Sequence, residues 1–362
     1  MWEKGISVYI GLQHSLDTNI SYLKLAHHYG YRRLFTSLHI PEADSRALVS
    51  DFRTLMAEAV NLGFSVTADI SPRTFSLLGA SHDDLSLFTE WGLNALRLDY
   101  GFSPAYIGAI TANSRLNIEI NASTVTAALL EDMATANVDF SRIQACHNYY
   151  PRPETGLSWA SFAQRSALLR SHGIPVFVFI PSLSSPRAPL FSGLPTVEKH
   201  RLIPPVVAAK EFLACQLLSG ILFGDPLASE EDLASVAALD PSCLELSVVV
   251  EKDLSPTERT ILFAPFHTCR IDSGEYAIRS QEARSLCKTA IPIRSAMPRP
   301  VGALTIDNEA YSRYMGEMQL ITDSLPADPR VNVAAHVIPE ERCLLSYIRP
   351  GSIFRLKEAT QR

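Results

Sequence analysis

The sequence predicts an α/β protein, with a (β/α)₈ TIM barrel in residues 1–240 and a small, mainly antiparallel β domain in residues 243–362. The first observation is a repeat. Eight short apolar runs start about 22 to 45 residues apart, and each is followed by a helix-like segment long enough to cross back over a sheet. No Gly-x-Gly-x-x-Gly motif follows the first run, which disfavours a dinucleotide-binding doubly wound sheet. After Pro241 the long helical patterns give way to short runs between turns.

The eight runs are almost continuously apolar, as expected for parallel strands that are covered on both faces. In chain order they are residues 6–11, 33–39, 65–71, 95–101, 117–123, 142–149, 175–182 and 220–225. Between them, residues 44–63, 124–137 and 158–173 repeat apolar side chains at three and four positions, which predicts helices packed on a core. In the second domain we expect strands at residues 244–250, 260–263, 276–278, 303–306, 317–321 and 352–356, and a loop at 253–258.

Composition excludes several classes of protein. Apolar residues make up 47% of the chain and charged residues 19%, so it can bury a large core. The net charge is −6 and the basic residues are scattered, so we expect no nucleic-acid partner. No signal peptide and no apolar stretch of roughly 20 residues is present, so we expect a cytoplasmic protein that does not bind membranes. The six cysteines are far apart and are expected to be reduced packing residues.

Five carboxylates lie at or near the carboxyl ends of the predicted barrel strands, where the active site of such a barrel is built. Asp225 either caps the following helix or belongs to the site, and Asp99 either acts directly or pairs with Arg97. Glu119 is equally suited to catalysis and to a buried ion pair with an arginine. Glu154 lies in a polar, proline-containing loop, so we expect it to face the substrate. Asp69 ends the third strand.

Paired carboxylates are what the cleavage of a glycosidic bond requires, because one acid protonates the leaving oxygen while another group stabilises or attacks the anomeric carbon. Polar groups that can hold a sugar accompany them: His39, Asn121, His147, Asn148 and Arg152. The two histidines are isolated and no cysteine pair has zinc-ligand spacing, so we expect no metal. No cofactor motif was found, and we expect no cofactor.

The second domain contains three arginines beside turn residues: Arg270, Arg279 and Arg299. Because arginine binds phosphate and carboxylate in a planar, bidentate manner, these side chains are candidates for holding the anionic group of a ligand between the domains. The alternative is an ion-pair network with Asp272 and Asp307 that fastens this domain to the barrel.

The sequence resembles the bacterial 6-phospho-N-acetylmuramidases, a family long described only as outer surface proteins. In the barrel the resemblance rests on Thr36-Ser37-Leu38-His39-Ile40-Pro41-Glu42, Ala68-Asp69-Ile70-Ser71-Pro72, Leu96-Arg97-Leu98-Asp99-Tyr100-Gly101, Asn121-Ala122-Ser123-Thr124 and His147-Asn148-Tyr149-Tyr150-Pro151-Arg152-Pro153-Glu154-Thr155-Gly156-Leu157. It continues through Gly193-Leu194-Pro195-Thr196, Gly224-Asp225, Ile278-Arg279-Ser280, Ile306-Asp307-Asn308 and Leu325-Pro326. The motif from His147 to Leu157 is long and highly specific.

The resemblance implies a barrel joined to a cyclophilin-like β domain that hydrolyses N-acetylmuramic acid 6-phosphate-(β1,4)-N-acetylglucosamine in the cytoplasm during cell-wall recycling. In this hypothesis Asp99 or Glu154 is the general acid, and another carboxylate such as Asp69 is the base or nucleophile. Asn121 and His147 hold the sugar. The main alternative is a sugar-phosphate-binding protein, cytoplasmic or at the surface, without catalysis. A barrel aldolase or isomerase is disfavoured, because no lysine lies at the predicted strand ends.

Overall fold

A computed structural model describes residues 2–38, 45–71, 74–75, 81, 84–98 and 101–359. The chain forms two compact units. The first comprises residues 1–212 and 216–238, and the second comprises residues 213–215 and 239–362.

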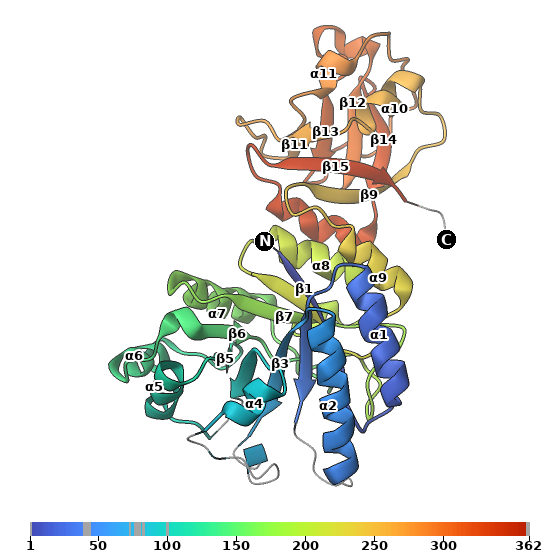
Figure 1. Cartoon of the computed structure of the whole chain (residues 1–362). Coiled ribbons are helices and arrows are strands. Elements are labelled where there is room, and N and C mark those ends of the chain that lie inside the picture. The colour runs from blue at the N-terminus through green and yellow to red at the C-terminus, as the bar shows by residue number, and fades with distance from the viewer. Residues whose placement is uncertain are drawn as a thin grey trace. The chain divides into compact units, whose positions relative to one another are not determined.

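The first unit contains a closed barrel of eight parallel strands within the described residues, which confirms the predicted fold class (Figure 1). The strands are β1 (Glu3–Ser7), β2 (Arg33–Ser37), β3 (Ser65–Ile70), β4 (Ala95–Leu98), β5 (Asn117–Asn121), β6 (Ile143–Cys146), β7 (Val176–Ile180) and β8 (Gly220–Phe223). The ring closes where Glu3 of β1 pairs with Gly220 of β8. A side chain at position 220 would place its Cβ 2.3 Å from the Glu3 carbonyl oxygen, so this close approach of the two strands needs glycine.

Helices surround the barrel strands on the outside (Figure 1). They are α1 (Leu16–His28), α2 (Ser45–Asn61), α4 (Ser86–Glu90), α5 (Pro104–Asn113), α6 (Ala127–Thr135), α7 (Trp159–Ser171), α8 (Pro205–Ala214) and α9 (Glu230–Ala237), with short 3₁₀ turns at Phe140–Arg142 and Glu198–His200. Side-chain oxygens start five of them by accepting a backbone N–H of the first turn, from Ser15, Ser103, Thr126, Ser158 and Ser229. Among the described helices, none has the length and apolar character that crossing a bilayer requires.

Strand β7 shows why the barrel runs are continuously apolar. All five of its residues are buried. Phe177 and Phe179 pack inside the barrel against residues of other strands, including Phe35 of β2. The residues that alternate with them, such as Val178, face the surrounding helices and are equally buried. The predicted strand at 6–11 starts too late, because Glu3 and Lys4 already pair with β8.

The second unit is built on a seven-stranded sheet in the order β10-β15-β9-β14-β12-β13-β11. Its strands are β9 (Leu244–Val250), β10 (His267–Thr268), β11 (Ala277–Arg279), β12 (Ala303–Asp307), β13 (Met318–Ile321), β14 (Val331–Val337) and β15 (Ile353–Glu358). The remaining elements are α10 (Pro256–Leu262), α11 (Ala283–Leu286) and 3₁₀ segments at Glu309–Tyr314 and Pro339–Tyr347. The sheet is mixed, since β15 runs parallel to β9 while the other pairs are antiparallel.

The predicted strand at 260–263 is wrong, and the loop predicted at 253–258 is correct only up to Ser255. Residues 256–262 form helix α10, which starts with a capping box between Ser255 and Glu258 and has Pro256 in its first turn. The box satisfies two otherwise unpaired N–H groups, and this outweighs the β propensity of the short apolar run that follows. Strand β14 was not predicted.

Asp307, at the end of β12, is a buried acid in this sheet. Its side chain is only 3% exposed, and its backbone N–H donates to the carbonyl of Glu317 at 3.0 Å. Burial, followed by the negative charges of Glu317 and Asp328, raises the pKa of Asp307 to about 7, although Arg299 and Arg279 oppose the shift. The fold therefore favours the protonated carboxyl group.

We expect Asp307→Asn to change how stability depends on pH. The folded-state pKa lies above the unfolded value, so the contribution of Asp307 is complete below about pH 4 and is lost as the pH rises through about 7. Asparagine cannot ionise, so at about pH 8 the free energy of unfolding of the variant should be about 2 kcal/mol higher than that of the parent. This difference should shrink toward pH 4.

Urea unfolding of the full chain at both pH values measures this difference. Asp253→Asn, at an exposed aspartate of the same unit, is the matched control. A stability difference that is the same at both pH values would contradict the prediction.

Candidate active site

A cavity of about 190 Å³ lies at the carboxyl ends of the barrel strands. Its lining comes from β2, β3, β4, the segment after β6, and β7, and consists of Phe35, Asp69, Arg97, Asn148, Tyr149 and Phe179. This is the end of the barrel at which catalytic side chains collect in proteins of this fold. Asp69 and Asn148 were predicted from the sequence as site residues, and the structure brings them together.

Arg97 connects the cavity to the barrel interior. Its Nη1 donates to the carbonyl of Cys146 at 2.9 Å and lies 3.3 Å from Oε1 of Glu119, while its Nη2 donates to Oδ1 of Asn148. Glu119 is 2% exposed and also accepts a hydrogen bond of 2.7 Å from Gln144. The geometry thus favours the structural alternative for Glu119, which neutralises Arg97 and so holds Arg97 and Asn148 in place.

Aromatic rings form one wall of the cavity. The Tyr149 ring meets those of Phe179 and Phe35 at centroid distances of 5.1 and 6.2 Å, and that of Tyr9 at 6.4 Å, with nearly perpendicular planes. Edge-to-face contacts of this kind fix ring positions. The sequence gives little indication of this wall, because phenylalanines within a buried strand look like ordinary core residues.

Asp225 holds a loop in place, and the alternative that it caps the following helix is wrong. Helix α9 is capped by Ser229. The carboxylate of Asp225 is fully buried and accepts backbone N–H groups from Ser182, Arg187 and Leu194, each at 2.9 Å. Burial raises its pKa, and the three hydrogen bonds oppose that rise. Asp225 therefore sets the path of the loop between β7 and α8.

His147 is not among the residues that line the cavity, and its role in binding the sugar stays a prediction. It is fully buried, and its ring nitrogens lie 3.2 Å from Oγ of Ser123 and 3.0 Å from Oγ of Ser166 on α7. Burial lowers the pKa of His147 to about 3, so the ring is neutral. Asn121 is half-buried at the end of β5, and its oxygen accepts the Ser123 N–H at 2.9 Å. Both residues therefore shape the turns around the site.

Glu154 is exposed on a firmly held loop. Its backbone has a φ of 71°, rare for a residue with a side chain, and its N–H donates to Glu198 at 2.8 Å. The same carboxylate accepts the N–H of Gly156 at 2.7 Å and binds Arg201 through two contacts of 2.7 Å. Arg201 lowers the pKa of Glu198 to about 2. Neither Glu198 nor Arg201 was predicted. The predicted Arg152 is exposed on this loop.

The arginines of the second unit are mostly paired with acids. Arg270 binds Asp272 through two contacts of 2.8 Å. Arg279 contacts Glu317 at 2.6 Å and Asp272 at 3.6 Å. The Nε of Arg299 donates to the carbonyl of Pro326. Within this unit the contacts favour an ion-pair network over a free anion site for Arg270 and Arg279, and their proposed place above the barrel stays a prediction.

Two predicted site residues, His39 and Asp99, lie outside the described residues. Over the described ranges, no group of three or more His, Cys, Asp or Glu side chains is arranged to hold a metal ion.

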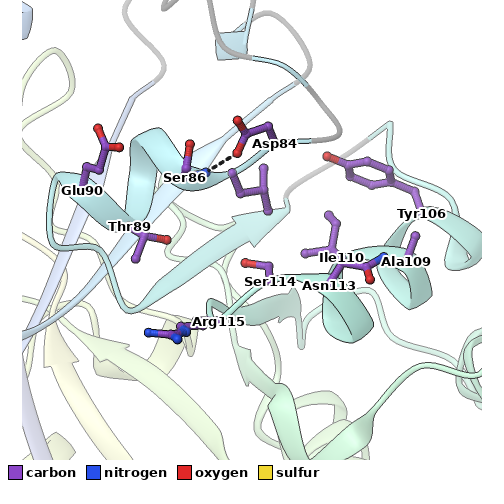
Figure 2. A pocket seen from close by; sticks show the side chains of 11 residues that line it. Asp84, Ser86, Thr89, Glu90, Tyr106, Ala109, Ile110, Asn113, Ser114 and Arg115 are labelled. Carbon is purple, nitrogen blue, oxygen red and sulfur yellow. Dashed lines mark hydrogen bonds between the residues drawn. The ribbon is translucent and has the colours of Figure 1, made fainter.

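A larger cavity, of about 430 Å³, lies between helices α4 and α5 on the outside of the barrel (Figure 2). It is lined by side chains of mixed character, among them Asp84, Glu90, Tyr106 and Arg115. Asp84 accepts the backbone N–H of Ser86, so that carboxylate serves the start of α4. None of the predicted site residues lines this cavity. The cavity at the strand ends is therefore the better candidate for catalysis, although it is smaller.

Two family models match the chain. One, described as 6-phospho-N-acetylmuramidase, N-terminal, matches residues 4–238, and the other, described as 6-phospho-N-acetylmuramidase, C-terminal, matches residues 244–357. The chain belongs to the 6-phospho-N-acetylmuramidase family. Membership implies a glycosidase, which agrees with the family resemblance and the reaction class predicted from the sequence.

The chain is similar to two crystal structures over nearly its whole length. An uncharacterized B. cereus protein is 30% identical, with a TM-score of 0.90 over 99% of this chain and 100% of that chain. A conserved protein of unknown function from an Enterococcus faecalis locus is 34% identical, with a TM-score of 0.78 over 98% and 96%. No curated protein matches the chain.

Proposed function

We propose that the protein hydrolyses N-acetylmuramic acid 6-phosphate-(β1,4)-N-acetylglucosamine. The observation that supports this most is the match to the 6-phospho-N-acetylmuramidase models over nearly the whole chain. The site is consistent with it, since an acid, an amide and a guanidinium group meet beside an aromatic wall at the carboxyl ends of the strands. Such a cavity offers apolar contact to a sugar ring and polar groups to orient it.

Asp69 is our candidate for the carboxylate that acts at the anomeric carbon. It is the acid among the cavity-lining residues, and it lies at the end of β3 next to Arg97 in the barrel, with Asp69 and Arg97 in register across β3 and β4. Asn148, held by Arg97 and by a hydrogen bond from its own backbone N–H to Ser123, would orient a hydroxyl or acetamido group of the sugar.

Glycoside hydrolysis needs a second carboxyl group, which protonates the leaving oxygen. Glu154 is the described candidate. Its side chain is exposed, whereas its backbone is fixed by Glu198, so the loop can present the acid in a reproducible position. Asp99 remains the alternative acid from the sequence. We further propose that the enzyme works in the cytoplasm, on a disaccharide released during cell-wall recycling, and needs no cofactor.

The test uses the full chain with two disaccharides that differ only in the 6-phosphate, and measures released N-acetylglucosamine. We expect kcat/KM to be at least about 100-fold higher for the phosphorylated substrate, since losing a charged hydrogen-bond partner costs a factor of this order. Equal rates would contradict recognition of the phosphate. Binding of the phosphorylated disaccharide without any release of N-acetylglucosamine would show a binding protein and contradict the proposal.

A further inference from the structure

Arg187 lies in the loop between β7 and α8 and was not among the predicted site residues. Its Nη1 donates to the hydroxyl of Tyr149 at 2.9 Å. Its guanidinium carbon lies 4.6 Å from the ring centroid of Tyr9 and 4.9 Å from that of Tyr149. Because Tyr149 lines the cavity, the cation sits directly beside the aromatic wall of the candidate active site.

The charge of Arg187 is not matched by an ion pair. Two other arginines near the site have acidic partners, since Arg97 contacts Glu119 and Arg201 contacts Glu198. Within the described part of the chain, no carboxylate lies within 4.0 Å of the Arg187 guanidinium, and its buried Nε has no hydrogen-bond acceptor. A buried donor without an acceptor is costly, so the hydrogen-bonding capacity of this guanidinium is not fully used within the protein.

The position of Arg187 is built into the fold. Its backbone N–H donates to Asp225, the buried carboxylate that also binds Ser182 and Leu194 and so fixes the loop at three points. Tyr9, on which the guanidinium stacks, is itself held by a hydrogen bond of 2.8 Å from its hydroxyl to the carbonyl of Gly224. A fixed planar donor group with unused hydrogen-bonding capacity is suited to an oxyanion.

We infer that Arg187 binds the phosphoryl group of the sugar substrate, an inference that rests on the proposed function. Its remaining N–H groups would donate to phosphoryl oxygens, while Tyr149 supplies a hydroxyl beside them. The inference places phosphate recognition within the barrel. It therefore needs no contribution from Arg270, Arg279 or Arg299.

The test is binding of three monosaccharides to the full chain by calorimetry: N-acetylmuramic acid 6-phosphate, N-acetylglucosamine 6-phosphate and N-acetylmuramic acid. The second has the phosphate without the lactyl carboxylate, and the third has only the carboxylate. We expect Arg187→Gln to raise the Kd of both phosphorylated sugars by about 30-fold and to leave that of N-acetylmuramic acid unchanged. Arg187→Lys keeps the charge but loses the planar arrangement of donors, so its Kd for the phosphorylated sugars should lie between those of the parent and of Arg187→Gln.

Arg170→Gln, at an exposed arginine on α7, is the matched control and should bind all three sugars as the parent does. Thermal unfolding of each variant verifies that the barrel is intact. Unchanged Kd values for the phosphorylated sugars in a folded Arg187→Gln variant would overturn the inference. Weaker binding of N-acetylmuramic acid alone would also overturn it, because that result would assign Arg187 to the lactyl group. Binding that depends on Arg187 without release of N-acetylglucosamine from the disaccharide would support this inference while contradicting the proposed hydrolysis. Parent protein that binds none of the three sugars would contradict both.

Discussion

Replacement of Asp69 by asparagine is expected to lower kcat for the phosphorylated disaccharide by about 1,000-fold, the scale of losing a group that acts on the reacting bond. The side chain is half-buried at the rim of β3 and lines the cavity. Asparagine has nearly the same shape and retains one acceptor oxygen. It cannot act as a base or nucleophile. The KM should change much less than kcat, because the contacts of the remaining lining residues with the sugar persist.

Initial rates of N-acetylglucosamine release, together with the thermal unfolding midpoint, measure this effect. Asp132→Asn, at an exposed aspartate on α6, is the matched control and should keep both values of the parent. A folded Asp69→Asn variant with kcat within about ten-fold of the parent would exclude Asp69 as the reacting carboxylate and leave Glu154 and Asp99 as the remaining candidates.

Glu119→Gln should mainly destabilise the barrel, by about 3 to 5 kcal/mol, because it leaves a buried guanidinium without its counter-charge. Arg97 is 3% exposed and lies 3.3 Å from Glu119, and Arg33 lies 3.9 Å from the same carboxylate. Glutamine preserves the volume but not the charge. Since Glu119 is absent from the cavity lining, the kcat of the folded fraction should stay within about ten-fold of the parent.

Urea unfolding gives the loss of stability, and rates measured well below the unfolding transition give kcat. Glu131→Gln, at an exposed glutamate on α6, serves as the control and should unfold as the parent does. Normal stability combined with a loss of kcat of about 1,000-fold would reverse the assignment and make Glu119 a catalytic residue.

The barrel strands could be predicted because each is buried on both faces. This makes β7, for example, apolar at every position, a pattern that stands out against the polar loops around it. Helix α10 could not be predicted from its apolar residues. The decisive interaction there is the reciprocal pair of hydrogen bonds between Ser255 and Glu258, which outweighs the residue preferences of the segment.

The site was predicted only in part. Asp69 and Asn148 were found because strand ends point to the active site of a barrel. His147 lies one residue before Asn148 at the same strand end, yet it faces away from the cavity, toward Ser166 on α7. In a regular strand, neighbouring side chains point to opposite faces, so their directions can be predicted. His147 and Asn148 lie beyond the end of β6 at Cys146, so this rule does not apply to them.

The amino-acid sequence alone reveals the eightfold repeat, the change of architecture near residue 240 and the family resemblance. These features depend on local hydrophobic periodicity and on contiguous motifs. The use of each polar side chain depends on partners distant in the chain. Asp225 binds N–H groups of a loop about 40 residues away, and Glu119 meets Arg97 from the neighbouring strand. Among the described residues, the buried Nε of Arg187 has no acceptor. Whether a charge is compensated in the interior or remains available to a ligand is therefore decided by three-dimensional packing, because burial makes each missing or present partner worth several kcal/mol.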